Sequence, residues 1–490
     1  MEPRVLMVDL NNFARYPTLT VGLLVAALRR AGIEVEVQCP LRHGVPPVAR
    51  EGQDTLGDHL KRRVFFSTHP MLVGSHDALR ARWAKREGEP HPLVIEEARR
   101  SMEERPVDVL LLSAYLDQHP TVVALGELAA SKGVPMLVGG PALNLPDTAA
   151  DWLAIPGMTA IVGAEADPWL PEMVRDVMVG GDLTRYPGTV VPGGARADEP
   201  APLRVLGGLP VPDFTDFPWD SYPQRILPVM TGRGCGWGRC VFCSDVSTAN
   251  GRTFRSRPTD EVLDELETLA DRHGTRDVIF LDIKLNSNVA MWRAITESFQ
   301  DRLPGGSWIG TVHVDDRTDN GLSAAQLRDA HASGMRRITF GLETGSQRVN
   351  DLMDKGTTMA RNADFVRQAH EAGLSVRTTA MMGYPGETAE DLDATAAFLH
   401  DHRDHLDRVR LSLFKAIPGT RFDRDYQRRP GAFPGLVDLK WDHRLARGHY
   451  RYTPATKRRY RKAKTRVLEA VYAINRRPLR PGVEMFDGLM

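Results

Sequence analysis

Three things are scarce in this chain of 490 residues: cysteine, long apolar runs and net charge. Four cysteines are too few to staple a chain of this size, which excludes a domain built on disulfides. No apolar run approaches the roughly 18 residues of a membrane-spanning helix, and the longest candidate, residues 19–28, ends at Arg29 and Arg30. Basic and acidic residues number 63 each, so no overall field recruits nucleic acid, and we expect neither a membrane nor a nucleic-acid partner.

The length and the rest of the composition indicate a multidomain intracellular enzyme. The length predicts about two to four domains, and the 42% hydrophobic content suffices for a core in each. Residues 1–4 lead directly into an apolar segment, so we expect no signal peptide. Unpaired thiols favour the cytoplasm.

Three of the four cysteines, Cys235, Cys240 and Cys243, lie within nine residues. A structural cysteine needs no neighbours of its own kind, whereas a metal centre needs several. Structural zinc sites use four ligands, usually as two separated pairs, and the remaining Cys39 lies far upstream. Three thiolates leave one iron of a [4Fe–4S] cluster open for chemistry, so an iron–sulfur cluster is favoured and zinc is the alternative.

The segment from Arg233 to Cys243 resembles the cluster loop of the radical S-adenosylmethionine (SAM) enzymes. The resemblance implies that the three cysteines hold the cluster and that SAM chelates the open iron. The commonest family spacing has three residues between the first two cysteines, whereas this chain has four, with Gly236 and Gly238 to absorb the extra residue. A similar loop with a tryptophan between glycines is found in a subset of the family that also carries a cobalamin-binding domain.

The first section, residues 1–180, alternates apolar strands with helices, which is typical of a parallel sheet covered on both faces. We expect a doubly wound, Rossmann-like or flavodoxin-like domain that binds its ligand beyond the carboxyl ends of the strands. An insertion at about 41–106 is too long to be structureless, and we expect helices in it, for example around 76–85. It is either a functional lid or a surface insertion.

A Gly- and Pro-rich stretch, 181–222, reads as a linker or an extended wrap between domains. Residues 223–421 repeat a strand and a helix six times, which predicts an open, partial TIM-type (β/α)6 barrel with the cluster loop leaving its first strand. Residues 422–490 are expected to form a small, mainly helical section. Its basic run, 457–466, is interpreted as the polar face of an amphipathic helix rather than a nucleic-acid site.

Later strand ends resemble the family's SAM site. The residues that the resemblance assigns to SAM are Phe242, Asp282, Glu343, Ser346, Gly383, Pro385 and Gly386. In the family, the segment around Glu343 and Ser346 lies near the ribose and methionine moiety, and the turn around Gly383 lies beside the adenine. Each motif alone is compatible with a tight turn, Phe242 with a core residue and Asp282 with a cap. Further polar residues follow the second and third strands and are either part of the SAM or substrate site or simply cap and turn residues. They are Lys284, Asn286, His313 and Asp315.

The first section resembles the cobalamin-binding domain that precedes many such barrels. The residues that carry this resemblance are Ser113, Gly139, Gly140, Gly163 and Glu165. In the family the serine contacts the nucleotide tail of cobalamin, and the paired glycines leave space for it. The Asp-x-His-x-x-Gly motif that supplies a cobalt ligand in other cobalamin proteins is absent after the first strand, and His119 is expected to be a loop histidine.

Together these resemblances imply a cobalamin-dependent radical SAM enzyme with three cofactors: a [4Fe–4S] cluster, SAM and cobalamin. The activity they imply is C-methylation of an unactivated carbon in natural-product or modified-peptide biosynthesis. The implied partners are a small-molecule or peptide substrate and an external electron donor such as flavodoxin or ferredoxin. A cyclase or rearrangement enzyme with the same cofactors is one alternative, and a non-catalytic iron–sulfur or zinc protein is another.

Overall fold

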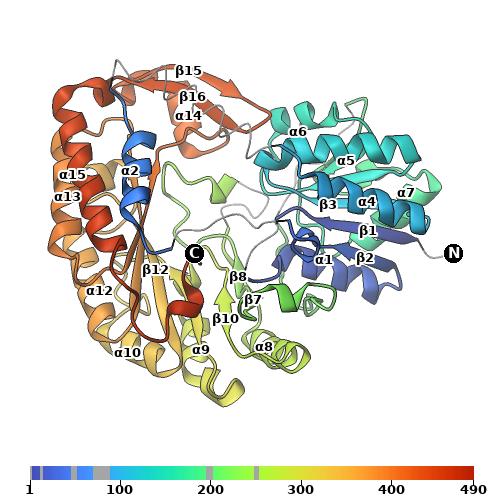
Figure 1. The fold of residues 1–490 in the computed structure, drawn as a ribbon, viewed down its shortest axis with the longest axis horizontal. Helices are drawn as coiled ribbons and strands as arrows, with labels where there is room; N and C mark the ends of the chain where they lie inside the picture. The colour runs from blue at the N-terminus through green and yellow to red at the C-terminus, as the bar shows by residue number, and fades with distance from the viewer. Residues whose placement is uncertain are drawn as a thin grey trace.

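The structure of the chain is a computed structural model that describes residues 3–11, 15–45, 52–69, 89–194, 202–247 and 253–489. Two six-stranded sheets dominate it (Figure 1). The first has the order β2-β1-β3-β4-β5-β6, in which only β6 is antiparallel to its neighbour. Its strands are β1 (Arg4–Asp9), β2 (Glu34–Gln38), β3 (Val109–Ser113), β4 (Met136–Gly139), β5 (Met158–Val162) and β6 (Thr189–Val190). The predicted doubly wound, flavodoxin-like order is confirmed, with its switch point between β1 and β3.

Helices cover both faces of this first sheet, because its strands are apolar on both sides. Met7 and Leu111 belong to one core, together with α1 and α7, whereas Val8 and Leu112 belong to a second core under α4, α5 and α6. The helices are α1 (Leu19–Arg30), α4 (Pro92–Glu104), α5 (His119–Lys132), α6 (Pro146–Leu153) and α7 (Leu170–Val179).

The second sheet is wholly parallel and runs in chain order, β7-β10-β11-β12-β13-β14. Its strands are β7 (Leu227–Val229), β10 (Val278–Phe280), β11 (Trp308–Val312), β12 (Met335–Glu343), β13 (Ser375–Met382) and β14 (Arg408–Leu413). Within the described ranges β7 and β14 do not pair, so the predicted six-unit barrel is open. Its helices are α8 (Thr259–His273), α9 (Val289–Arg302), α10 (Ala324–Ala332), α11 (Gln347–Leu352), α12 (Met359–Glu371) and α13 (Ala389–Asp401). Capping boxes at Ser323 and Thr388 begin α10 and α13.

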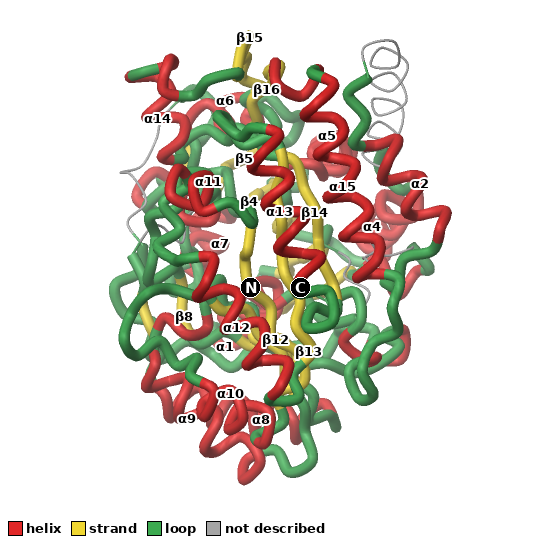
Figure 2. Tube along the Cα trace, turned by 90° about the vertical axis from the view of Figure 1, so that its left-hand side faces the viewer, coloured by secondary structure: helices red, strands yellow, loops and turns green. Residues whose placement is uncertain are grey.

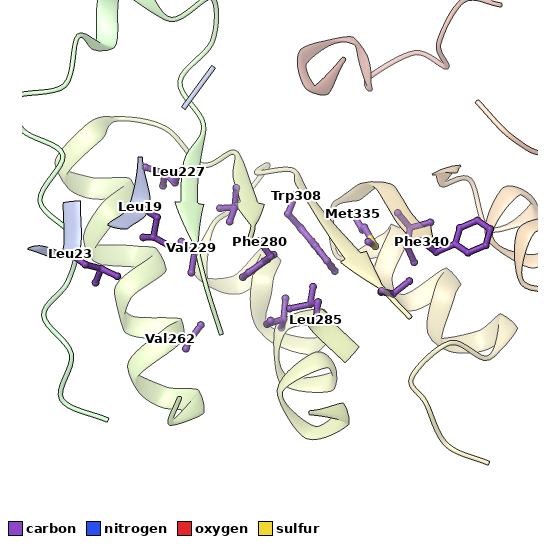
Figure 3. Close-up of a cluster of buried hydrophobic side chains, with 14 of the residues drawn as sticks. Leu19, Leu23, Leu227, Val229, Val262, Phe280, Leu285, Trp308, Met335 and Phe340 are labelled. Atoms are coloured by element: carbon purple, nitrogen blue, oxygen red, sulfur yellow. The ribbon is translucent and has the colours of Figure 1, made fainter. Parts of the chain in front are cut away.

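One buried core joins the barrel to the first domain. Figure 3 shows Leu227, Phe280, Trp308 and other side chains of successive barrel strands in a row, with Leu19 and Leu23 of α1 at its end. Residues 202–222 complete this junction: the ring of Phe214 lies so close to Gly22 of α1 that a Cβ there would come within 2.2 Å of it. The stretch expected to be a linker or wrap therefore wraps tightly between α1 and the barrel.

The insertion between β2 and β3 reaches the far side of the molecule. Its helix α2 (Leu56–Phe65) lies beside α15 (Arg458–Asn475) in both Figure 1 and Figure 2. The Nζ of Lys464 donates to the carbonyl of Phe66 at 2.6 Å, and the His59 ring stacks on Tyr472. The helix expected at 76–85 lies outside the described residues.

The C-terminal section contains a hairpin that the sequence did not predict. It consists of β15 (Leu436–Asp442) and β16 (Arg447–Tyr452), after the helix α14 (Arg421–Arg428). The register of β15 shifts around Asp438, whose φ is 56°. The connecting residues 443–446 contain no Gly, Pro, Asn or Asp, so the sequence carries no signal for the hairpin turn. The hairpin tip reaches the first domain, where Trp152 Nε1 donates to the carbonyl of Arg444 at 2.9 Å.

The basic run near the C-terminus lies in α15, as expected for an amphipathic helix. One face of α15 buries Ala463, Val467, Val471 and Ile474 against α13 and β14. No helix in the described part of the chain is both long and apolar enough to cross a bilayer.

Candidate cofactor sites

The three clustered cysteines lie on the loop that leaves the mouth of the barrel after β7. A two-residue antiparallel ribbon, β8 (Gly232–Arg233) with β9 (Arg255–Ser256), forms the stem of this loop. All three thiols are half-buried, and none is in a disulfide. Burial raises the pKa of the Cys240 thiol, and the ammonium group of Lys355 opposes that rise. The donor set is three soft sulfur ligands on one short loop, which fits an iron–sulfur cluster.

The longer segment between Cys235 and Cys240 is held in place by its tryptophan. Trp237 Nε1 donates to the carbonyl of Asp354 at 2.8 Å, and its ring stacks on His313 with 5.9 Å between centroids. A Cβ on Gly356 would lie 2.1 Å from the indole, so only glycine leaves room for it there. The four-residue gap is therefore accommodated by docking its tryptophan against the turn that follows α11.

The remaining cysteine, Cys39, is buried under the first sheet and lies apart from this loop. Among the residues that the structure describes, no three His, Cys, Asp or Glu side chains are grouped closely enough to hold one metal ion.

Glu343 ends β12 beside the cysteine loop in a left-handed backbone conformation, with a φ of 62°. Its Oε1 accepts a hydrogen bond from Thr379 Oγ1 at 2.7 Å. Lys355, which no motif in the sequence assigned to the site, is 3% exposed, and its Nζ lies 6.0 Å from the centre of the Phe242 ring. A cation, a carboxylate and an aromatic ring thus meet next to the thiols, and these groups can bind the charged and planar parts of SAM.

Two of the residues expected to bind SAM have partners within the protein. Ser346 caps α11 by accepting from the amide of Val349, and its Oγ donates to Asp391 at 2.6 Å. Both oxygens of Asp282 accept from Thr231, and burial raises the Asp282 pKa to about 6. The structure therefore gives Ser346 and Asp282 roles in holding the strand ends, and a direct contact with SAM stays a prediction.

The turn after β13 brings Gly383, Pro385 and Gly386 together, with φ of 80° and 91° at the two glycines. The amide of Gly383 donates to Glu387 Oε2 at 2.8 Å, and the hydroxyl of Tyr460 in α15 donates to the same oxygen. Burial raises the pKa of Glu387 to about 7. This carboxyl thus holds the backbone of the turn that we expect beside the adenine.

Other polar residues at the barrel mouth are paired with one another. Lys284 Nζ lies 2.5 Å from Asp315 Oδ2, and both side chains are 1% exposed. Burial lowers the pKa of Lys284, and burial next to Lys355 lowers the pKa of His313 to about 3, so this imidazole is neutral. Asn286 binds the backbone of His313 and Asn320. These residues form a buried polar network beneath Trp237.

A cavity of about 350 Å³ opens at the carboxyl edge of the first sheet, at the switch point where such folds bind ligands. Ser113, Gly139, Gly140 and Glu165 line it, and their contact with cobalamin stays a prediction. Gly163 is not among its lining residues. A Cβ on Gly163 would come within 2.7 Å of Asn144, and one on Gly140 within 2.0 Å of the Ala114 carbonyl, so both glycines allow close backbone packing.

The cavity presents an unused polar group. Asn11, two residues after β1, is 6% exposed and lines the cavity, and its Oδ1 has no hydrogen-bond partner among the residues that the structure describes. Such a buried group is costly unless something binds it. An apolar pocket with a few polar groups, at the small end of ligand-site volumes, fits the tail of a corrinoid. No motif pointed to Asn11.

Comparison with known proteins matches both halves of the chain. A family model described as the radical SAM superfamily matches residues 229–399. The chain is 28% identical over 299 residues to the uncharacterized methyltransferase PH0819 of Pyrococcus horikoshii, an alignment that covers 59% of this chain and 62% of that protein.

Two solved structures share the fold. OxsB, a cobalamin-dependent S-adenosylmethionine radical enzyme solved with aqua-cobalamin and S-adenosylmethionine bound, superposes with a TM-score of 0.68 at 15% identity, over 92% of this chain and 64% of OxsB. TsrM, a radical S-adenosylmethionine methyltransferase from Kitasatospora setae solved with cobalamin and a [4Fe–4S] cluster, gives 0.65 at 17% identity, over 99% of this chain and 92% of TsrM. The chain therefore spans less than two thirds of PH0819 and of OxsB and nearly all of TsrM.

Proposed function

We propose that this chain, whose residues 229–399 match the radical SAM superfamily, is a cobalamin-dependent methyltransferase that methylates an unactivated carbon of a small molecule or peptide. The names of PH0819 and TsrM as methyltransferases support the reaction class, and the shared fold of OxsB and TsrM supports the two-domain arrangement. Natural-product or modified-peptide biosynthesis is the setting that we propose.

One observation carries the proposal: the cavity of the first domain opens onto the barrel. Ser113 and Gly139 line it from the first sheet, whereas Met230, Arg233 and Leu281 line it from the ends of the barrel strands and from the stem of the cysteine loop. A ligand in this cavity would therefore lie next to the cluster loop, as a methyl donor and a radical generator that act on one substrate must.

We assign the cofactors to the following residues. The [4Fe–4S] cluster is held by Cys235, Cys240 and Cys243, SAM by Phe242, Asp282, Glu343, Ser346, Gly383, Pro385, Gly386 and Lys355, and cobalamin by Ser113, Gly139, Gly140, Glu165 and Asn11. Gly163 contributes indirectly, by allowing close backbone packing beside the cavity. When bound, the cluster and SAM supply a hydrogen-abstracting radical, and cobalamin supplies the methyl group.

The chain's own contribution is to hold charges and to exclude water. Lys355 places a buried cation opposite the thiolates and Glu343, which favours the anionic cluster and the carboxylate of SAM. His313 is neutral, whereas Asp315 binds both Lys284 and Arg317, so the network beneath Trp237 adds positive charge to the floor of the site. The electron that such chemistry needs would come from an external donor such as flavodoxin or ferredoxin.

Reconstitution tests the cofactor assignment. The protein is loaded anaerobically with iron, sulfide and hydroxocobalamin and then desalted, and we expect the visible spectrum to show about one corrinoid per chain beside the cluster absorption. After reduction with dithionite in the presence of SAM, we expect 5′-deoxyadenosine. Retention of no corrinoid would contradict the proposal, and absence of 5′-deoxyadenosine would reduce the protein to an iron–sulfur binder.

Product mass tests the reaction class. With a substrate taken from the products of the neighbouring genes, a methyl transfer adds one CH₂ to the substrate. A product with the mass of the substrate would instead identify a rearrangement.

A further inference from the structure

Two arginines at the stem of the cysteine loop extend into the first domain. Arg233 ends β8 and Arg255 begins β9, and the two residues pair in register across the ribbon. Their acceptors, Glu165 and Asp167, lie on the loop between β5 and α7. The four side chains therefore join the base of the loop that carries the cysteines to the rim of the cavity.

The contacts are specific. Arg233 makes two parallel bonds of 2.9 Å to the two oxygens of Asp167, and its Nη1 lies 3.7 Å from Glu165. Arg255 Nη1 lies 2.7 Å from Glu165 Oε2, and the amide of Leu203 donates to that oxygen at 2.7 Å. The forked bond fixes both the distance and the angle between its partners, which a single ion pair does not.

Burial makes this geometry costly to change. The four side chains are between 4% and 7% exposed, and two positive charges face two negative ones. Removing one partner leaves an uncompensated charge in a dry interior, so the groups must stay paired as long as the two domains are docked.

The network also lies between the two candidate cofactor sites. Cys235 follows Arg233 by two residues, and Arg233, Glu165 and Asp167 all line the cavity of the first domain. A shift of the network would therefore change the distance between the cluster loop and whatever occupies the cavity.

We propose that the Arg233–Asp167 and Arg255–Glu165 pairs are positioning residues, which clamp the cluster loop to the corrinoid site and so set the separation between radical formation and methyl donation. This inference rests on the proposed function. It extends that function by assigning Asp167, Arg233 and Arg255, and by giving Glu165 a role in alignment.

A matched control exists in the same region. Arg257, just after β9, forms a forked pair of 2.9 and 2.7 Å with Glu265 of α8, and these side chains are 5% and 1% exposed. This pair is as buried as the clamp, but it lies entirely within the barrel. Loss of the Arg257–Glu265 pair should lower stability without moving one cofactor site relative to the other.

The test compares Asp167→Asn with Glu265→Gln, and uses Arg233→Lys as a second clamp variant in case the first fails to fold. In the protein without cofactors, we measure hydrogen exchange of the amides in 232–247. We expect exchange there to rise on the order of tenfold in the clamp variants and to stay unchanged in Glu265→Gln. In the reconstituted enzyme, we expect iron and corrinoid contents to be retained.

The ratio of 5′-deoxyadenosine to methylated product is the catalytic readout. A misplacement of about 1 Å can cost up to 10²-fold in a positioned reaction, so we expect this ratio to rise on the order of tenfold in the clamp variants only. Equal ratios in the clamp and control variants, or unchanged loop exchange in Asp167→Asn, would overturn the proposal. If the wild-type protein retains no corrinoid, the proposed function fails, and the exchange measurement still decides whether the network holds the loop.

Discussion

At the scale of single residues, the cysteine loop depends on a glycine that lies more than a hundred residues away in the chain. Gly356 leaves the space that the indole of Trp237 fills, and Trp237 belongs to the four-residue segment between Cys235 and Cys240 that is one residue longer than usual. A departure from the usual spacing is thus compensated by a backbone position on another element. Tryptophan is too large and rigid to move aside at low cost.

We predict that Gly356→Ala displaces Trp237 and lowers the iron content after reconstitution. The φ of Gly356 is 64°, so alanine also costs about 1–2 kcal/mol of backbone strain. Gly274→Ala is the matched control, because its φ is 63° and nothing lies within 4 Å of a Cβ there. Iron per chain and the thermal midpoint are measured for both variants. Equal iron contents would contradict the idea that the packing of Trp237 against Gly356 supports the cluster loop.

At the scale of elements, α15 ties the C-terminal section to the turn after β13 through Glu387. The Tyr460 hydroxyl and the Gly383 amide share one carboxylate oxygen, and burial raises the pKa of this carboxyl from its usual 4.5 to about 7. Between these two values the folded protein binds the proton more tightly than the unfolded chain does. The free energy of unfolding therefore falls as the pH rises through this window.

We predict that Glu387→Gln removes this part of the pH dependence. Relative to the variant, the wild-type protein should lose up to about 3 kcal/mol of its free energy of unfolding between pH 4.5 and 7. Urea denaturation of both proteins at about pH 5 and about pH 8 measures this difference. Asp9 and Asp282, whose pKa values are also raised to about 6, contribute equally to both proteins and cancel. Parallel stability curves would show that Glu387 is not the group responsible.

At the scale of the whole molecule, the two candidate sites rest on different sheets and meet only at the domain junction. The thiols belong to the loop after β7, whereas Ser113 and Gly139 belong to β3 and β4 of the first sheet. Most of each site therefore comes from a scaffold of its own, although the barrel adds Met230, Arg233 and Leu281 to the lining of the cavity. Two contacts hold the scaffolds together. The tip of the β15–β16 hairpin contacts α6 of the first domain, and α2 of the insertion contacts α15 near the C-terminus.

We predict that the two cofactors load independently. A variant with Cys235, Cys240 and Cys243 all changed to alanine should bind no cluster iron and still retain hydroxocobalamin after desalting. Ser113→Leu, which places a larger side chain in the cavity, should lose corrinoid and keep its iron. Iron assay and the visible spectrum measure both contents. Loss of corrinoid in the cysteine variant would show that the cavity forms only when the cluster loop is loaded.

Patterns that are local in the chain allowed much of the fold and site to be predicted. The apolar strands and the alternation of strand and helix each reflect the burial of a few neighbouring residues. The cysteine cluster could also be predicted from the sequence, because its three cysteines lie on one loop. The hairpin was not predicted because the residues that connect its strands, 443–446, include no turn former, and Lys355 was not assigned because nothing local shows that its side chain is buried.

The sequence by itself determined the chemistry that the chain carries: three thiols with one ligand position open, on a barrel that follows a doubly wound domain. Only the tertiary structure decided how those parts are joined. Arg233 and Asp167 are separated by 66 residues, and Lys464 and Phe66 by 398, so no periodicity relates them. Such pairs form because the docked domains exclude water and leave each buried charge or polar group to find its partner across the junction.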